Sequence, residues 1–164
     1  MDELVALREL LERVGTQQKD SGDVMYSTYL DIKRRSTKEA EVLQIVLNGI
    51  SHYKQGRFKE AIKLFDSAIS LEVDGDAYYN RGVTYMELGD LKNAIGDFSG
   101  AIWFCPQLGN AYHNRALCIL QILQDNKALS SYMMQYDLEF AKSDLRKSIE
   151  LGNEESRSFL EMVS

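Results

Sequence analysis

The sequence predicts an all-α fold, an α-solenoid of stacked helix–turn–helix repeats. The first observation is a central stretch, Asp76 to Pro106, in which apolar residues recur at helical spacing on both sides of a glycine turn. The second is that this pattern occurs 33 residues earlier and, interrupted, once more afterwards. The third is the single proline in 164 residues, which suits a nearly all-helical chain. Repeats of about this length are typical of stacked repeat architectures.

The two helices of the central stretch are predicted to share one close-packed seam. Gly82 has no side chain, so a neighbouring helix can approach its backbone closely. Gly89 suits the left-handed residue that ends a helix, and Asp90 can cap the next one. Pro106 should stop that second helix. Its buried stripe is predicted to consist of Leu91, Ala94, Phe98, Ala101 and Ile102.

Two further copies of this pattern can be aligned with the central one. The earlier copy has the same residue types at Gly49, Gly56, Phe58, Ala61, Phe65, Ala68 and Ile69. The later copy is weaker, and it consists of Tyr112, Ala116, Leu138, Ala141, Leu145, Ser148 and Ile149. In this alignment Tyr136 takes the place of the turn glycine in the third copy.

This pattern resembles the tetratricopeptide repeat family over roughly Val42 to Gly152. The family pattern is an aromatic residue, a small residue, a tyrosine and a glycine–aromatic turn, followed by alanine, phenylalanine, alanine and proline. The first copy departs from the pattern at three positions. They are Ile45 for the opening aromatic residue, His52 for the tyrosine and Val73 for the proline.

Residues 1–38 are predicted to form a helical extension before the repeats. An amphipathic helix at 2–14 has a leucine face, a polar loop follows at 15–22, and a second helix runs from about Asp23 to Arg35. Ser36 and Glu39 form a capping box that opens the first repeat helix. That helix should end at Gly56, and its partner should span 57–72.

Residues 39–152 are predicted to hold three repeats, the third with an insertion at 123–135. The first helix of this repeat begins near Asn110 and the second runs from Asp137 to Leu151. The insertion is too apolar for a solvated loop, so we expect an extra helical turn or two within it. Residues 153–164 are expected to form a capping helix whose apolar residues, Phe159, Leu160 and Val163, cover the end of the stack.

Composition argues against several classes of function and location. The formal net charge is −6, and residues 39–164 carry the whole acidic excess, whereas nonspecific nucleic-acid binding needs a basic stripe. No apolar stretch is long enough to span a membrane. The first residues include acids and have charges every few positions, so they do not resemble a signal peptide. We therefore expect a cytoplasmic protein that binds neither nucleic acid nor membrane, with Cys105 and Cys118 as free thiols.

The motifs of catalysis and of metal or cofactor binding do not occur in the sequence. His52 and His113 lie in different repeats, and neither has a cysteine or second histidine at ligand spacing. Glycine-rich phosphate loops and the GxSxG motif are absent. The prediction is a protein that is not an enzyme, with no catalytic residue, cofactor or metal.

The resemblance implies a concave groove, lined by the first helix of each repeat, that binds a protein or peptide segment. We expect Tyr79, Val83 and Leu117 to anchor an apolar segment there, while Asn80 and Asn114 bond to its backbone. Alternatively, the chain's own flanking helices cover this surface. The candidate partner-binding residues are Leu43, Val46, Ile50, Tyr79, Asn80, Val83, His113, Asn114 and Leu117.

One use of the family can be tested on the sequence itself. Relatives that grip the acidic C-terminal tails of heat-shock chaperones use a clamp of lysine, asparagine and arginine. In this chain only Asn80 matches. Its other positions carry Val46, Ile50, Asn110 and Asn114, so the cations that would hold a pair of carboxylates are missing. The sequence therefore disfavours that function.

The main functional prediction is a non-enzymatic scaffold for protein–protein interaction, and two alternatives stay open. One is a small acidic chaperone that holds a secreted protein segment, similar to the class II chaperones of type III secretion. The other is a structural subunit of a stable complex. The leucine face of residues 1–15 is also expected to dock, either as a homodimer contact or as a plug in the groove, because so short a helix is marginal alone.

Overall fold

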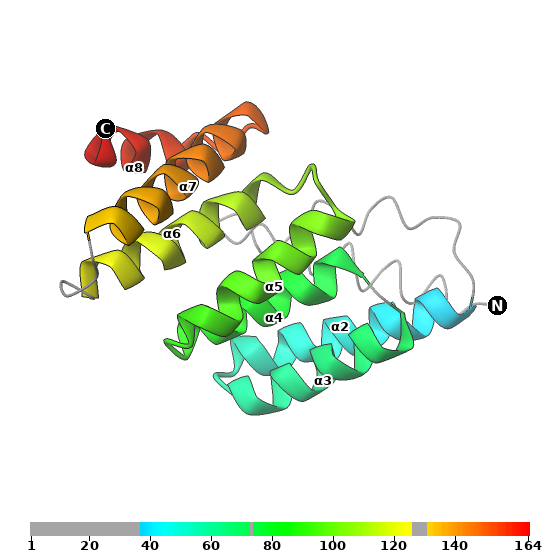
Figure 1. Ribbon diagram of the computed structural model, residues 1–164. Helices are drawn as coiled ribbons and strands as arrows, with labels where there is room; N and C mark the ends of the chain where they lie inside the picture. Colours follow the sequence, from blue (N-terminus) through cyan, green and yellow to red (C-terminus); the bar gives the residue numbers. More distant parts are fainter. Residues whose placement is uncertain (1–36, 73, 126–130) are drawn as a thin grey trace. The chain divides into compact units, whose positions relative to one another are not determined.

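The computed structural model describes the backbone of residues 37–72, 74–125 and 131–164, and the prediction of an all-α fold is confirmed there: these residues form seven helices and no strand (Figure 1). The helices predicted within 1–36 lie outside the described residues. The seven helices are α2 (Thr37–Lys54), α3 (Phe58–Leu71), α4 (Gly75–Glu87), α5 (Leu91–Phe104), α6 (Gly109–Asp125), α7 (Ser131–Glu150) and α8 (Glu155–Val163).

The helices form three antiparallel pairs followed by a single short helix (Figure 1). Within each pair the two helices pack along their length, α2 on α3, α4 on α5 and α6 on α7. The second helix of one pair contacts the first helix of the next, and α7 contacts α8 in the same way. The first helices α2, α4 and α6 also contact one another in sequence, so residues on them can contribute to a common face.

The turn inside the central pair has the predicted construction. Gly89 has a φ of +75°, in the left-handed region that residues with a side chain rarely adopt. The Asp90 carboxylate accepts a hydrogen bond from the Asn93 amide at 3.3 Å and so caps α5. Gly56 repeats the left-handed conformation, at φ +71°, between α2 and α3.

In the first two repeats, a glycine on the first helix receives a phenylalanine from the second. A Cβ atom built on Gly82 would lie 2.9 Å from Cε1 of Phe98 and 3.2 Å from Cβ of Asp97. One built on Gly49 would lie 2.5 Å from Cε1 of Phe65. Each ring therefore packs directly on bare backbone, as the spacing of these residues predicts.

We expect Gly82→Leu to reduce the free energy of unfolding by about 1–3 kcal/mol, because the new side chain must displace the Phe98 ring. Gly96→Leu is the matched control in the same helix pair, since no atom lies within 4 Å of a Cβ at this exposed position. The control should be neutral or stabilising, because leucine is the better helix former. Urea denaturation of both variants measures the difference. Equal stability of the two proteins would contradict the close-packed seam.

The placement of Tyr136 as a turn residue in the third repeat is wrong. Helix α7 begins at Ser131, six residues before the predicted start at Asp137, so Tyr136 lies inside it. Residues 131–136 contain neither glycine nor proline, and nothing in them stops a helix from extending toward its N-terminus. Residues 123–125 belong to α6, and the connection at 126–130 falls outside the described residues.

The C-terminal end of the stack is closed by α8. Gly152 has a φ of +93° just after α7, at the predicted end of that helix. The apolar residues of α8 predicted to cover the stack, Phe159, Leu160 and Val163, pack against a buried cluster from α6 and α7. This cluster consists of Ala116, Ile119, Leu123, Ala141 and Leu145. No helix in the described ranges is both long and apolar enough to cross a membrane.

Candidate protein-binding face

The nine predicted partner-binding residues come from three consecutive first helices. We call them the candidate face: Leu43, Val46 and Ile50 on α2, Tyr79, Asn80 and Val83 on α4, and His113, Asn114 and Leu117 on α6. Because α4 contacts both α2 and α6, the helix order places the residues of α4 between the other two sets. The three sets differ in burial and in hydrogen bonding.

The α2 end of the candidate face is buried. Leu43, Val46 and Ile50 are exposed by 4%, 0% and 3%, and their neighbours Val42 and Leu47 are also buried. The polar residues Gln44 and Asn48 on the same helix are more exposed and bond to each other, Nε2 to Oδ1 at 3.1 Å. In this structure the α2 end therefore offers no apolar side chain to a partner.

The centre of the candidate face is open to solvent in part. Val83, Asn114 and Leu117 are half-buried. The Tyr79 hydroxyl accepts a hydrogen bond from Nδ2 of Asn114 at 3.2 Å, which joins α4 to α6. The Tyr79 ring is buried and tilted against Phe98, with 5.8 Å between ring centroids. This centre combines apolar side chains with amide groups on two adjacent helices.

Asn80 contributes a buried acceptor with unused capacity. Its side chain is 1% exposed, and Nδ2 donates to the backbone oxygen of Asp76 at 2.9 Å. Its Oδ1 atom has no hydrogen-bond partner. A buried polar atom without a partner destabilises the fold, by about 1–3 kcal/mol in general, and at 1% exposure the Asn80 side chain is closed to a partner in this structure.

His113 is committed to α8. Its Nδ1 atom lies 2.7 Å from Oγ of Ser156, and its ring meets Phe159 edge-on with 5.5 Å between centroids. Burial lowers the pKa of His113 below the ordinary value, while the negative charge of Glu155 acts in the opposite direction. The imidazole is therefore neutral at pH 7, and it packs within the α6–α8 interface instead of facing an open surface.

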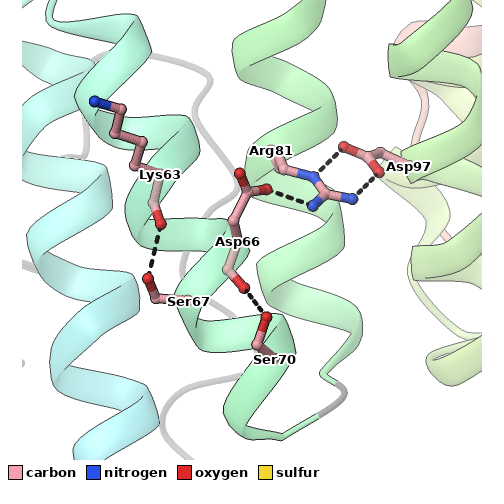
Figure 2. A network of polar contacts seen from close by, with 6 residues as sticks. All are labelled: Lys63, Asp66, Ser67, Ser70, Arg81 and Asp97. Atoms are coloured by element: carbon pink, nitrogen blue, oxygen red, sulfur yellow. Dashed lines mark hydrogen bonds and ion pairs between the residues drawn. The ribbon is translucent and has the colours of Figure 1, made fainter.

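Arg81 of α4 holds three helices together, a role that the sequence analysis missed (Figure 2). It donates from Nε and Nη2 to both carboxylate oxygens of Asp97 on α5, at 2.8 and 2.7 Å. Its Nη1 atom donates to Asp66 on α3, in the preceding repeat, at 2.6 Å. The guanidinium also lies 5.4 Å from the centroid of the Tyr78 ring.

Arg115 repeats this arrangement one repeat later. It donates to both carboxylate oxygens of Asp144 on α7, at 2.7 and 2.8 Å, and to Ser99 Oγ on α5 at 3.0 Å. Its guanidinium lies near the rings of Tyr112 and Phe140. The signal in the sequence was available: a tyrosine three residues before an arginine recurs at a spacing of 34 residues. These arginines link repeats and take no part in the candidate face.

The two cysteines are free thiols without an activating environment. Burial raises the pKa of the Cys118 thiol to about 12, and burial together with the charge of Asp76 raises that of Cys105. Both thiols therefore stay protonated and weakly nucleophilic at pH 7. Within the described ranges, no group of three or more histidine, cysteine or carboxylate residues is arranged to hold a metal ion.

Comparison with known proteins identifies the repeats. A family model described as tetratricopeptide repeat matches residues 75–102, which contain α4 and most of α5. Human tetratricopeptide repeat protein 6 is 37% identical over 108 residues, which is 63% of this chain and 19% of that protein. Residues 75–102 form a tetratricopeptide repeat. Mouse DnaJ homolog subfamily C member 7 is 27% identical over 117 residues, and this match covers 67% of this chain and 24% of the mouse protein.

Solved structures show the same fold for this repeat protein. The first tetratricopeptide domain of Spaghetti (RPAP3), bound to the HSP90 peptide SRMEEVD, superposes with a TM-score of 0.61 at 22% identity. The match covers 74% of this chain and 89% of that one. The Yersinia enterocolitica type III secretion chaperone SycD, in complex with a YopD peptide, superposes with a TM-score of 0.63 at 21% identity. That match covers 78% of this chain and 94% of the SycD chain. The chain spans about a fifth to a quarter of the curated relatives named above.

Proposed function

We propose that this chain is a non-enzymatic protein-interaction module. It binds an uncharged, partly apolar segment of a partner protein across α4 and α6. The observation that carries the proposal is the pairing of half-buried apolar side chains, Val83 and Leu117, with amide groups on the same two helices. Asn114 is the half-buried amide of the two, and its side-chain oxygen could accept from a backbone N–H of an extended segment, whereas Asn80 is buried at 1% exposure.

The candidate face has no charged side chain, and this predicts the chemistry of the segment that it binds. None of its nine residues is an acid, a lysine or an arginine, and the one histidine among them, His113, is buried and neutral at pH 7. A peptide such as SRMEEVD carries several carboxylates. Here Val46, Asn110 and Asn114 stand where the family's clamp has cations, so desolvated carboxylates would find no counter-charge. We therefore propose an apolar, neutral segment rather than an acidic tail.

Two alternative functions are kept. SycD, whose fold is similar, was solved with a peptide of the translocator YopD, which supports a chaperone that holds a secreted segment. The other is a structural subunit of a stable complex, which would have to use the α4–α6 centre as well, because Leu43, Val46 and Ile50 are already buried within the chain itself. A cytoplasmic location belongs to the main proposal, since Cys105 and Cys118 are free thiols. Self-association through residues 1–15 stays a prediction, because those residues lie outside the described part.

The experiment compares three variants that each replace an apolar residue by aspartate. We expect Val83→Asp and Leu117→Asp to lose the proteins that wild type captures from native lysate, as identified by mass spectrometry, because a carboxylate would face an apolar segment. Trp103→Asp is the control on α5, where the tryptophan side chain is 80% exposed. If Val83→Asp and Leu117→Asp both still capture the partner proteins, or if only Trp103→Asp loses them, the candidate face is not the binding surface. Thermal melts check that all three variants fold.

A variant in which Tyr79 and Asn80 are both replaced by alanine is a less selective test of binding. Because Tyr79 is buried against Phe98 and bonded to Asn114, its truncation would leave a cavity and an unpaired amide. Loss of capture by that double variant could therefore reflect unfolding, so the half-buried residues Val83 and Leu117 are the better probes.

A further inference from the structure

We infer that α8 is a pH-controlled latch: with His113 neutral the helix is docked on the third repeat, and protonation of His113 in mild acid releases it. The inference goes beyond the proposed function and does not depend on the identity of any partner. It concerns the last element of the described chain, Glu155–Val163, and the apolar surface of α6 and α7 beneath it.

The contact between α6 and α8 is built around one buried pair of polar side chains. Ser156, in the first turn of α8, is fully buried, and its hydroxyl lies 2.7 Å from Nδ1 of His113, which is itself 6% exposed. The Phe159 ring lies against the same imidazole at 74° between ring planes. Just before the helix, Nδ2 of Asn153 donates to Oδ1 of Asn110 at 2.6 Å. A neutral imidazole satisfies this environment with a single hydrogen bond to Ser156.

A protonated imidazole does not suit the docked geometry. Protonation turns both ring nitrogens into donors and adds a charge at a site that is largely withdrawn from water. The charged group that acts on this ring from α8 is Glu155, and its attraction is weaker than the effect of burial, so the pKa is lowered. On α6 the nearest charge along the chain is Arg115, which is paired with Asp144 of α7. The neighbouring side chains Asn110 and Asn114 are uncharged.

The direction of the linkage follows from that shift. The docked state holds His113 at a pKa below its ordinary value of about 6.5, and a released α8 would return the imidazole to water and to that value. The released state then binds the proton more tightly, so docking is complete above about pH 6.5 and is weakened as the pH falls below it. In this interval one linked proton increases the opening equilibrium by up to about tenfold per pH unit.

α8 is also the element that can open without unfolding the repeats. It has nine residues and packs on α7 and on His113, and its ion pair, Arg157 with Glu154, is local. Helices α2 to α5 make their own paired contacts and do not depend on it. Release would uncover apolar side chains of the cluster that includes Ala116 and Leu145, so acid would expose an apolar surface at this end of the stack.

The test follows amide hydrogen exchange of the intact chain between pH 7.5 and 5.5, corrected for intrinsic exchange rates. We expect protection of the α8 amides to fall severalfold, by at most about tenfold, across this range, because a single proton is linked to opening. Helices α4 and α5 should keep their protection. His113→Gln keeps a neutral hydrogen-bonding side chain and should remove the pH dependence. His52→Gln, which changes the chain's other histidine, should leave it intact.

Two results would overturn the inference. One is α8 protection that is independent of pH in wild type. The other is an identical pH dependence in the His113→Gln variant, which would assign the opening to another group. A second measurement follows the protonation of the His113 ring by NMR. The midpoint of this titration in the intact chain must lie at lower pH than the midpoint in a variant truncated after Asn153, which lacks α8. Equal midpoints would contradict a latch operated by this histidine.

Discussion

Phe98→Ala is expected to reduce the free energy of unfolding by about 3–5 kcal/mol. The ring is fully buried, packs on the bare backbone of Gly82 and lies 5.8 Å from the Tyr79 ring. Truncation leaves a cavity in the seam between α4 and α5, and the rigid backbone of these helices limits how far that cavity can collapse. The loss is a large fraction of the stability of a domain this size, so denaturant unfolding should show a clearly lower midpoint.

Phe104→Ala is the matched control for this variant. It removes the same atoms from the last residue of the same helix, where the side chain is half-exposed and stacks on Tyr78 at 5.8 Å. Its effect should be about 1 kcal/mol, since roughly half of the apolar area is already in water. A Phe98→Ala variant as stable as Phe104→Ala would show that the seam is not the main packing interaction of the central repeat.

Asp97→Ala is expected to destabilise the protein by about 2–3 kcal/mol. The Asp97 side chain is 8% exposed and takes two hydrogen bonds from Arg81, so its removal leaves a largely buried guanidinium with the more exposed Asp66 as its remaining partner. The matched control is Asp66→Ala, which removes the outer carboxylate from the same arginine and should cost less than about 1 kcal/mol.

A double variant separates the value of the pair from the cost of breaking it. In Arg81→Met with Asp97→Leu, both charged groups are replaced by apolar side chains, and most of the lost stability should return. Chemical denaturation of wild type, Arg81→Met, Asp97→Leu and the double variant completes the cycle. If Asp97→Ala is as stable as wild type, or if the double variant is the least stable of the set, Arg81 does not link the repeats as the geometry indicates.

The sequence was sufficient to predict the fold because its strongest signals are local. Gly82 lets the Phe98 ring approach the helix backbone closely, and Gly89 adopts the left-handed conformation of the turn. Only glycine meets either requirement without strain. Phe65 and Phe98 occupy equivalent positions one repeat apart and are both fully buried. Where no such residue marks the boundary, prediction failed. The start of α7 was placed six residues late because no helix breaker lies between Ser131 and Asp137.

The candidate site was less predictable because it depends on contacts between repeats. The family resemblance predicts equivalent inward positions for Tyr79 and His113, yet Tyr79 is bonded to α6 and His113 to α8. The burial of Val46 could not be read from its position on one helix, since burial depends on what packs against it. Arg81 and Arg115 were missed because an arginine in a helix reads as a solvated charge unless its carboxylate partners, 16 and 29 residues away, are known.

The most direct test of the central claim is site-specific photo-crosslinking in native lysate. A photoreactive phenylalanine analogue would replace Leu117 on α6 or, in the matched protein, the exposed Lys92 on α5. The adducts would be identified by mass spectrometry. We expect the analogue at Leu117 to form a discrete adduct with a partner, and an excess of unmodified wild-type protein to suppress that adduct. The analogue at Lys92 should form none. Adducts that form from Lys92 and not from Leu117 would contradict binding on the first-helix side of the repeats.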